Sequence, residues 1–199
     1  MKLGPGAFIA VTGASGVGKD AVLAAARAVA GDDAHFPTRV ITRRPGGGEE
    51  STPVDEAEFR RAREAGAFAV WWQAHGLSYA IPVSADAAVL EGRVVVANVS
   101  RGALDALEER YARLVVVGVT VSDAVRAQRL RARGREDGEA VDRRLSRPDP
   151  APGRVPDQMI RNDGTIGEGG AQLLRVISSV QRGSTARARL RPTVPGGRP

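Results

Sequence analysis

Short apolar runs alternate along this chain with segments that have the periodicity of helices. Residues 7–11, Ala-Phe-Ile-Ala-Val, form a continuous apolar run that stops at Gly13, which predicts a buried strand. The alanine-rich segment 20–30 follows, and Gly31 comes directly after it, so a helix is predicted there. The start of the chain therefore predicts a strand, a glycine-rich turn and a helix.

Later segments repeat this alternation. Strands are predicted at 94–97, 114–117 and 155–160, and helices from about Arg101, from Ser122 and over 170–180. Buried strands that alternate with helices indicate an α/β fold, with a parallel sheet at the core and helices flanking it.

Two regions interrupt the alternation, at about 45–86 and about 133–156. Both are polar or rich in glycine and proline, which predicts insertions over one end of the sheet. Residues 183–199 place arginines among Gly, Ser, Thr and Pro and predict a basic, disordered tail. We expect residues 1–182 to form a single domain.

The composition is that of a compact domain. Of the 199 residues 42% are hydrophobic and 26% charged, which is enough for a proper core. The absence of cysteine excludes disulfides and thiolate metal sites, and two histidines are too few to suggest zinc. No apolar stretch approaches the ~20 residues that a membrane span needs, so we expect a cytoplasmic protein with no membrane partner.

The net charge of +6 comes almost entirely from arginine, because Lys2 and Lys19 are the only lysines. Arginine suits the two-pronged recognition of phosphate groups. Aromatic residues make up only 4% of the chain, and no basic stretch is interleaved with stacking side chains, so nucleic acid is not an expected partner. The sequence does not predict an oligomeric state.

The turn after the first strand has the G-x-x-x-x-G-K form of a phosphate-binding loop, or P-loop. Glycines allow its backbone N–H groups to turn toward phosphates, the following helix adds a partial positive charge, and the lysine adds a full one. The motif predicts nucleoside triphosphate binding, and a glycine-rich turn that serves packing alone is the alternative. The candidate residues are Gly13, Ala14, Ser15, Gly16, Val17, Gly18 and Lys19.

The residue after this lysine departs from the usual pattern. The motif ordinarily continues with Ser or Thr, whose hydroxyl binds magnesium, whereas this chain has Asp20. A carboxylate can bind the same hard cation through oxygen, so Asp20 is a candidate metal ligand. Stabilisation of the first helical turn by a negative charge is its alternative role.

Five segments in this order resemble a known family. The resemblance is to the ribose 1,5-bisphosphate phosphokinases of bacterial phosphonate breakdown, which are related to the guanylate kinases. It covers about residues 6–181, and it implies a P-loop kinase fold in which the unusual aspartate is a family feature. The segments are GASGVGKD at 13–20, RVITR at 39–43, NVSR at 98–101, RGRE at 133–136 and NDG at 162–164.

The resemblance also implies a reaction. The terminal phosphoryl group of ATP would be transferred, with Mg²⁺, to a small phosphorylated sugar, ribose 1,5-bisphosphate, giving 5-phosphoribosyl 1-diphosphate and ADP. The insertion at about 45–86 would bind this acceptor, and the insertion at about 133–156 would be a lid. The implied catalytic residues are Lys19, Asp20, Arg133 and Arg144, and Arg135 is an implied ATP contact.

The candidate acceptor contacts come from two regions. The first resembles the segment by which guanylate kinases hold the phosphate of GMP, together with a tyrosine nearby. The second follows the predicted strand 94–97, because ligands bind at the carboxyl ends of strands in open α/β sheets, although Ser100 could instead cap a helix. The candidates are Arg39, Thr42, Arg43, Glu49, Tyr79, Asn98, Ser100 and Arg101.

Two positions argue against guanine as the bound base. Val70 stands where guanylate kinases carry a guanine-binding glutamate, and residues 97–99 hold no carboxylate in place of their aspartate. Unpaired guanine donors would cost about 1–3 kcal/mol each, so GMP is expected to be a poor substrate. The alternatives are another nucleoside monophosphate or small-sugar kinase, and a non-catalytic interaction module, which could have lost Lys19.

Overall fold

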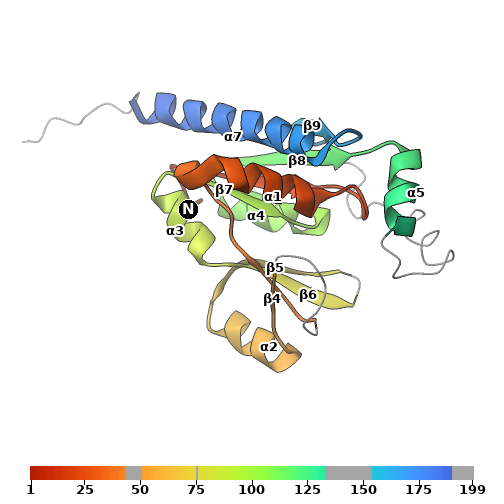
Figure 1. The fold of residues 1–199 in the computed structure, drawn as a ribbon. Helices are drawn as coiled ribbons and strands as arrows, with labels where there is room; N and C mark the ends of the chain where they lie inside the picture. The colour runs from red at the N-terminus through yellow and green to blue at the C-terminus, as the bar shows by residue number, and fades with distance from the viewer. Residues whose placement is uncertain (44–50, 75, 133–153, 190–199) are drawn as a thin grey trace, which may run out of the picture.

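A five-stranded sheet, parallel throughout, forms the centre of the molecule (Figure 1). The computed structural model describes residues 1–43, 51–74, 76–132 and 154–189. The strand order is β2-β7-β1-β8-β9, which places the strand before the P-loop in the middle. The strands are β1 (Ala7–Thr12), β2 (Ala34–His35), β7 (Val94–Asn98), β8 (Leu114–Thr120) and β9 (Gln158–Arg161).

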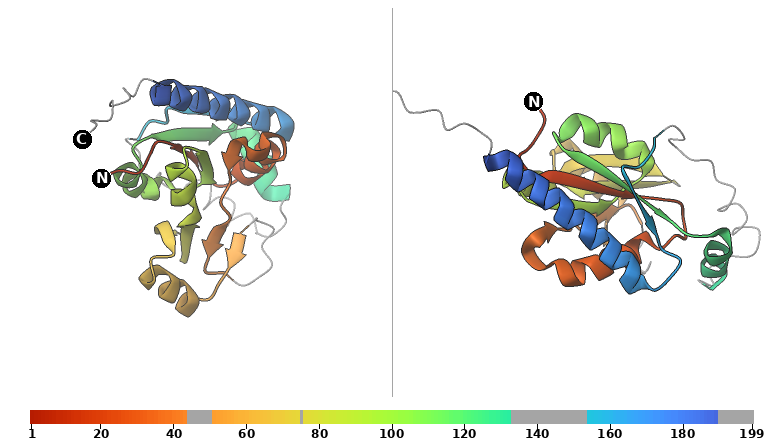
Figure 2. Two further views of the ribbon diagram at one scale, coloured as in Figure 1. Left: turned by 90° about the vertical axis from the view of Figure 1, so that its left-hand side faces the viewer. Right: turned by 90° about the horizontal axis from the view of Figure 1, so that it is seen from above.

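Helices cover both faces of this sheet, and β1 is buried at every position. Ile9 and Val11 belong to one buried cluster, with α1 (Lys19–Ala30) and α7 (Ile166–Arg189), which lie side by side on one face (Figures 1 and 2). Phe8 and Ala10 belong to a second cluster. The elements that contribute to it from the other face include α3 (Ser84–Leu90) and α4 (Leu104–Arg110), the latter preceded by η2 (Arg101–Ala103).

A second sheet of four strands, in the order β4-β3-β6-β5, lies below the first in the view of Figure 1. A short helix forms the outer layer over this sheet. At its start the Asp55 side chain accepts a hydrogen bond from the Glu58 amide, and the Glu58 side chain accepts one from the Asp55 amide. The elements are β3 (Arg39–Ile41), β4 (Ser51–Pro53), α2 (Glu56–Glu64), β5 (Phe68–Ala74) and β6 (Leu77–Pro82). Residues 36–38 connect β2 of the first sheet to β3 of the second, and the chain returns from β6 to β7 of the first sheet through Val83 and α3.

The predicted α/β fold is confirmed, and the differences lie mainly at element ends. The last strand begins at Gln158, not at residue 155, because Pro156 has no N–H to donate to a strand ladder. The second sheet already begins at Arg39, before the predicted insertion. The remaining element, α5 (Asp123–Ala132), begins next to Ser122 as predicted.

The prediction of a disordered tail from residue 183 is wrong for residues 183–189, which continue α7 to Arg189. This helix begins earlier than predicted because Thr165 and Glu168 form reciprocal side-chain-to-amide hydrogen bonds at its start. Adding a residue to an existing helix is far easier than starting one, and alanine and arginine are good helix formers.

Among the helices of the described ranges, none has the length and hydrophobicity of a membrane span.

Candidate active site

The P-loop joins the carboxyl end of β1 to the start of α1. Gly13, Gly16 and Gly18 have φ values of 146°, 88° and 86°, which side chains rarely adopt. A Cβ atom at Gly13 would lie 2.4 Å from the carbonyl oxygen of Val119, so β8 leaves no room for a side chain there. The loop's conformation therefore favours glycine at all three positions, and packing against β8 requires it at Gly13.

Lys19 lies over this loop. Its Nζ donates hydrogen bonds to the carbonyl oxygens of Gly13 at 2.8 Å and Ala14 at 3.1 Å. Since both acceptors belong to the loop, the ammonium group is held where a triphosphate bound by the loop would meet it. Phosphate oxygens could take the place of these carbonyls as acceptors, and they carry a full negative charge.

Side chains from α5 and from the end of β9 support the loop from behind. Asn162, which is buried, donates from Nδ2 to the carbonyl oxygen of Val17 at 2.9 Å. Arg126 donates from Nε to the carbonyl oxygen of Ser15 at 3.0 Å. Arg129 donates from Nη2 to the carbonyl oxygen of Asn162 at 2.9 Å, and its Nη1 lies 3.4 Å from that of Val17. These bonds fix the loop relative to two distant segments.

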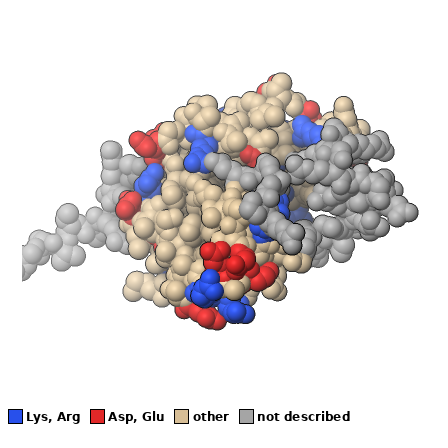
Figure 3. Space-filling view, turned by 60° about the horizontal axis from the view of Figure 1, so that its bottom comes forward, with Lys and Arg blue, Asp and Glu red and all other residues tan. Residues whose placement is uncertain are grey.

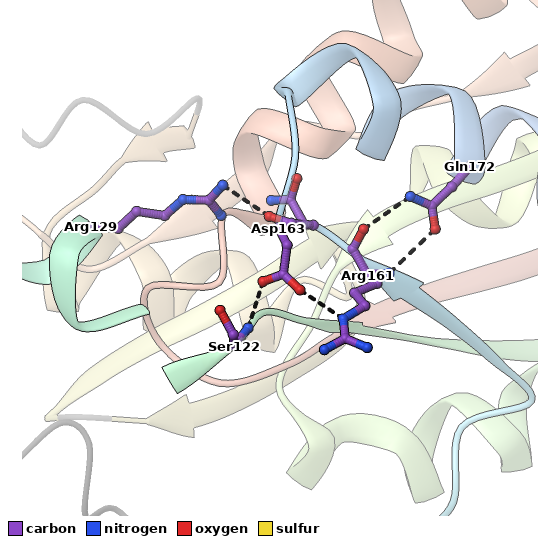
Figure 4. Close-up of polar contacts among 6 residues, drawn as sticks. Ser122, Arg129, Arg161, Asp163 and Gln172 are labelled. Carbon is purple, nitrogen blue, oxygen red and sulfur yellow. Dashed lines mark hydrogen bonds and ion pairs between the residues drawn. The ribbon is translucent and has the colours of Figure 1, made fainter. Parts of the chain in front are cut away.

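The residues around this support are themselves held by hydrogen bonds (Figure 4). The Asp163 carboxylate accepts from the Ser122 amide at 2.6 Å and from Nε of Arg161 at 2.7 Å. The amide bond first, and then the guanidinium group, lowers the pKa of Asp163 below its ordinary value. The Gln172 side chain pairs with the Arg161 backbone, which ties β9 to α7.

Asp20, in the first turn of α1, forms the second part of the site. Its Oδ1 accepts a hydrogen bond from Nδ2 of Asn98 at 2.7 Å and from Nη2 of Arg39 at 3.1 Å. Asn98 ends β7 of the first sheet and Arg39 begins β3 of the second, so the carboxylate joins three elements that lie far apart in the sequence. Three predicted site residues are thus in direct contact.

A small cavity of about 50 Å³ lies beside this carboxylate. Its wall combines apolar side chains, such as Leu23 and Phe36, with the polar side chains of Asp20, Arg39 and Asn98. Apolar walls with a few convergent polar groups are typical of small-molecule sites.

The other predicted acceptor contacts lie in different surroundings. Thr42 is buried, and its Oγ1 accepts a hydrogen bond from the Ser78 amide at 2.8 Å, so this hydroxyl joins β3 to β6. Ser100 accepts from the Gly102 amide at 3.3 Å, which is the capping role that composition had left open. Tyr79 stacks on Trp72 with ring centroids 5.6 Å apart.

Arg43 lies two residues after the end of β3, Arg101 begins η2, and both are partly exposed. The remaining predicted residues lie outside the described part of the chain. They are Glu49, Arg133, Arg135 and Arg144.

The positions that argue against guanine are apolar and buried. Val70 is 5% exposed and belongs to the core cluster that includes Trp72 and Ile81. Val99 is 3% exposed in the same cluster. Neither position offers a hydrogen-bond acceptor side chain for a purine edge.

Sequence reasoning included Asn162 in the NDG segment of the family resemblance, but it did not predict that Asn162, Arg126 and Arg129 support the P-loop. Arg126 and Arg129 belong to an arginine-rich stretch in which each arginine alone resembles an ordinary solvated side chain, and Asn162 stands in a sequence typical of a turn. The two arginines are three residues apart on a helix and so lie on one face of it. This spacing is the feature of the sequence that could have indicated their shared role. Their partners lie more than 100 residues away.

Comparison with known proteins gives consistent results. The chain is 65% identical over 176 residues to ribose 1,5-bisphosphate phosphokinase PhnN of Pseudofrankia inefficax, covering 88% of this chain and 93% of that protein. It is 42% identical over 177 residues to the protein of the same name from Bradyrhizobium diazoefficiens, covering 88% and 89%.

Among solved structures, guanylate kinase from Anaplasma phagocytophilum superimposes with a TM-score of 0.65. It covers 91% of this chain and 89% of its own, at 18% identity, and so establishes the fold alone. No family model matches the sequence.

Proposed function

Because this chain belongs to the ribose 1,5-bisphosphate phosphokinase family, we propose that it transfers the terminal phosphoryl group of ATP to ribose 1,5-bisphosphate. The products are 5-phosphoribosyl 1-diphosphate and ADP. The observation that supports this most directly is the Asp20 network, which connects the P-loop helix to an arginine of the second sheet. The donor loop and a cationic acceptor region thereby meet at one carboxylate.

The transfer forms one bond and breaks one bond. An oxygen of the acceptor's 1-phosphate attacks the terminal phosphorus of ATP, and the bond from that phosphorus to the oxygen bridging to ADP breaks. Such a reaction needs positioning and neutralisation of charge more than covalent participation by the protein. The P-loop amides and Lys19 supply both on the ATP side, since the loop holds the phosphates and the ammonium group offsets their charge.

Asp20 fits the role of a magnesium ligand. Among the described residues, no group of three or more His, Cys, Asp or Glu side chains could hold a metal ion, so the other ligands would be phosphate oxygens and water, as is usual for Mg²⁺. A bound Mg²⁺ neutralises charge on the triphosphate. Asn98 and Arg39 both bind Oδ1 of Asp20, and these hydrogen bonds set the orientation of the carboxylate.

The acceptor carries two phosphates and calls for several cations. Arg39, Arg43 and Arg101 are the described arginines that the family resemblance places on its side of the site, and Arg39 lies against the small cavity. Guanidinium groups bind phosphate through paired, charge-assisted hydrogen bonds. Arg39 therefore has two tasks, because it orients Asp20 and also lines the cavity in which a phosphate group of the acceptor could bind.

Phosphorus NMR with ATP and Mg²⁺ tests this function. Separate reactions would contain ribose 1,5-bisphosphate, GMP or gluconate as acceptor. A new diphosphate signal with the first acceptor alone is the expected result. Turnover of GMP would refute the argument from Val70 and Val99, and inactivity with all three would refute the proposed acceptor.

A further inference from the structure

A second and larger cavity lies beside β2, and both residues of this strand line it. Its volume is about 560 Å³. The residues that line it come from both sheets, from α1, η1 and the start of α3, and from the connecting segment 36–38. The polar side chains on its wall include Arg27, His35, Thr38, Thr52, Ser84 and Arg93.

This cavity is separate from the Asp20 network. His35 pairs with Val95 in the sheet, and Asn98 follows three residues later along β7. At about 3.3 Å per residue along β7, Val95 and Asn98 are roughly 10 Å apart. Arg27 and the segment 36–38 line both cavities, so the two are neighbours that share one wall.

The electrostatics of the second cavity favour an anion. Arg27 approaches from the last turn of α1 and Arg93 from the residue before β7, while Asp32 contributes a carboxylate to the wall. Burial first, and then the charges of Arg93 and Arg27, lower the pKa of His35, and Glu91 opposes this only in part. The two arginines outnumber the one acidic residue of the wall, Asp32, so the lining carries a net positive charge that an anion would neutralise.

Acidic and basic side chains are interspersed over the described part of the face in Figure 3, with both kinds close together, so this face is not uniformly basic. The backbone holds one of the two arginines in place, since Arg93 donates from Nη2 to the carbonyl oxygen of Asp32 at 3.4 Å. That contact fixes one arginine beside η1 (Gly31–Asp33).

We propose that this cavity between the two sheets, lined by Arg27, His35 and Arg93, is a second binding site, for a phosphate group. The ligand is free inorganic phosphate or a small phosphomonoester, and the cavity has room for an organic substituent beyond the phosphate. Hydroxyl groups of Thr38, Thr52 and Ser84 line the same space and are suitable hydrogen-bond donors to phosphate oxygens.

His35 provides a direct measurement of binding. The chain has only two histidines, so a His75→Gln background leaves His35 as the single imidazole signal in an NMR spectrum. Inorganic phosphate, and ribose 5-phosphate in a second arm, would be titrated against chloride at equal ionic strength. We expect a saturable shift of the His35 signal and a titration midpoint at higher pH, because a bound anion stabilises the imidazolium.

Two variants separate this site from the P-loop. Arg93→Gln should weaken phosphate binding at least about tenfold, since it removes a charge-assisted hydrogen bond. Lys19→Ala should leave the His35 shift unchanged. If Arg93→Gln does not fold, Ser84→Asp, at an exposed position on the wall, serves instead and should expel phosphate by adding a carboxylate.

The outcomes decide between the sites and the ligands. A shift with inorganic phosphate that is lost in the Arg93 or Ser84 variant supports the site, and tighter binding of ribose 5-phosphate identifies a phosphomonoester as its ligand. A shift no larger than that with chloride would overturn the proposal. So would a shift that disappears in Lys19→Ala and persists in Arg93→Gln. None of these readouts depends on kinase activity.

Discussion

Exchange of Asp20 and Asn98 would show whether the carboxylate must stand on the P-loop helix or serves only to connect the two sheets. In the native chain Nδ2 of Asn98 donates to Oδ1 of Asp20 at 2.7 Å. The single variant Asn98→Asp replaces this donor with a second carboxylate. Two unit charges about 4 Å apart repel by about 4 kcal/mol at an effective dielectric constant near 20.

Part of that repulsion is reduced by solvent and by Arg39. The Asp20 side chain is 40% exposed, and the Arg39 guanidinium lies 3.1 Å from Oδ1. We therefore expect Asn98→Asp to lower the free energy of unfolding by about 1–3 kcal/mol. The double variant Asp20→Asn with Asn98→Asp rebuilds the hydrogen bond in the opposite direction, so its stability should return to within about 1 kcal/mol of the native value.

Activity should not return with stability. The double variant keeps one carboxylate but moves it from α1 to the end of β7, away from the loop that holds the triphosphate. We expect kcat to stay about 10–100-fold below the native value. Urea unfolding gives the stability, phosphorus NMR gives the rate, and Asn98→Ala is the control that removes the donor without adding charge.

Two results would refute this reasoning. Native stability in Asn98→Asp would mean that the hydrogen bond to Asp20 contributes nothing to the fold. Native turnover in the double variant would mean that the position of the carboxylate is irrelevant to transfer, and the proposed magnesium role would then be wrong.

Three further predictions concern other parts of the site. Lys19→Ala should lower the transfer rate by about 10²–10³-fold with an unchanged circular dichroism spectrum, and near-native turnover would contradict the P-loop assignment. Val70→Glu should lower the free energy of unfolding by about 2 kcal/mol or more, because it buries a charge in the core, and should not create GMP turnover in an ADP-release assay. Asn162→Ala should weaken ATP binding, measured by calorimetry, about tenfold, because the Val17 carbonyl loses a buried donor; unchanged affinity would show that this support is dispensable.

Local features of the sequence were sufficient for the donor half of the site. The strand, the glycines and Lys19 are consecutive, so the physical requirements of a phosphate-binding loop are satisfied within 13 residues, 7–19. The α/β fold could be predicted for the same reason, because strand and helix periodicities are short-range patterns. The resemblance to ribose 1,5-bisphosphate phosphokinases, which rested on five such segments, is confirmed by the relatives at 65% and 42% identity.

Contacts between distant segments needed the tertiary structure. Asp20, Arg39 and Asn98 were each candidates, but the sequence could not indicate that one carboxylate oxygen accepts hydrogen bonds from both of the others. Thr42 matched a phosphate-binding segment, and the structure adds that its Oγ1 accepts a hydrogen bond from the Ser78 amide, a partner that the sequence did not indicate. A motif identifies a residue's type and spacing, whereas its hydrogen-bond partners depend on how sheets and helices pack.

The same distinction applies to the cations. The sequence alone determined that this chain has an arginine-rich composition and a loop for a triphosphate. Only the tertiary structure decided which arginines support that loop and which line the second cavity, because Arg27 and Arg93 are 66 positions apart in the sequence. Electrostatic potential depends on distance in space, and the fold alone sets that distance.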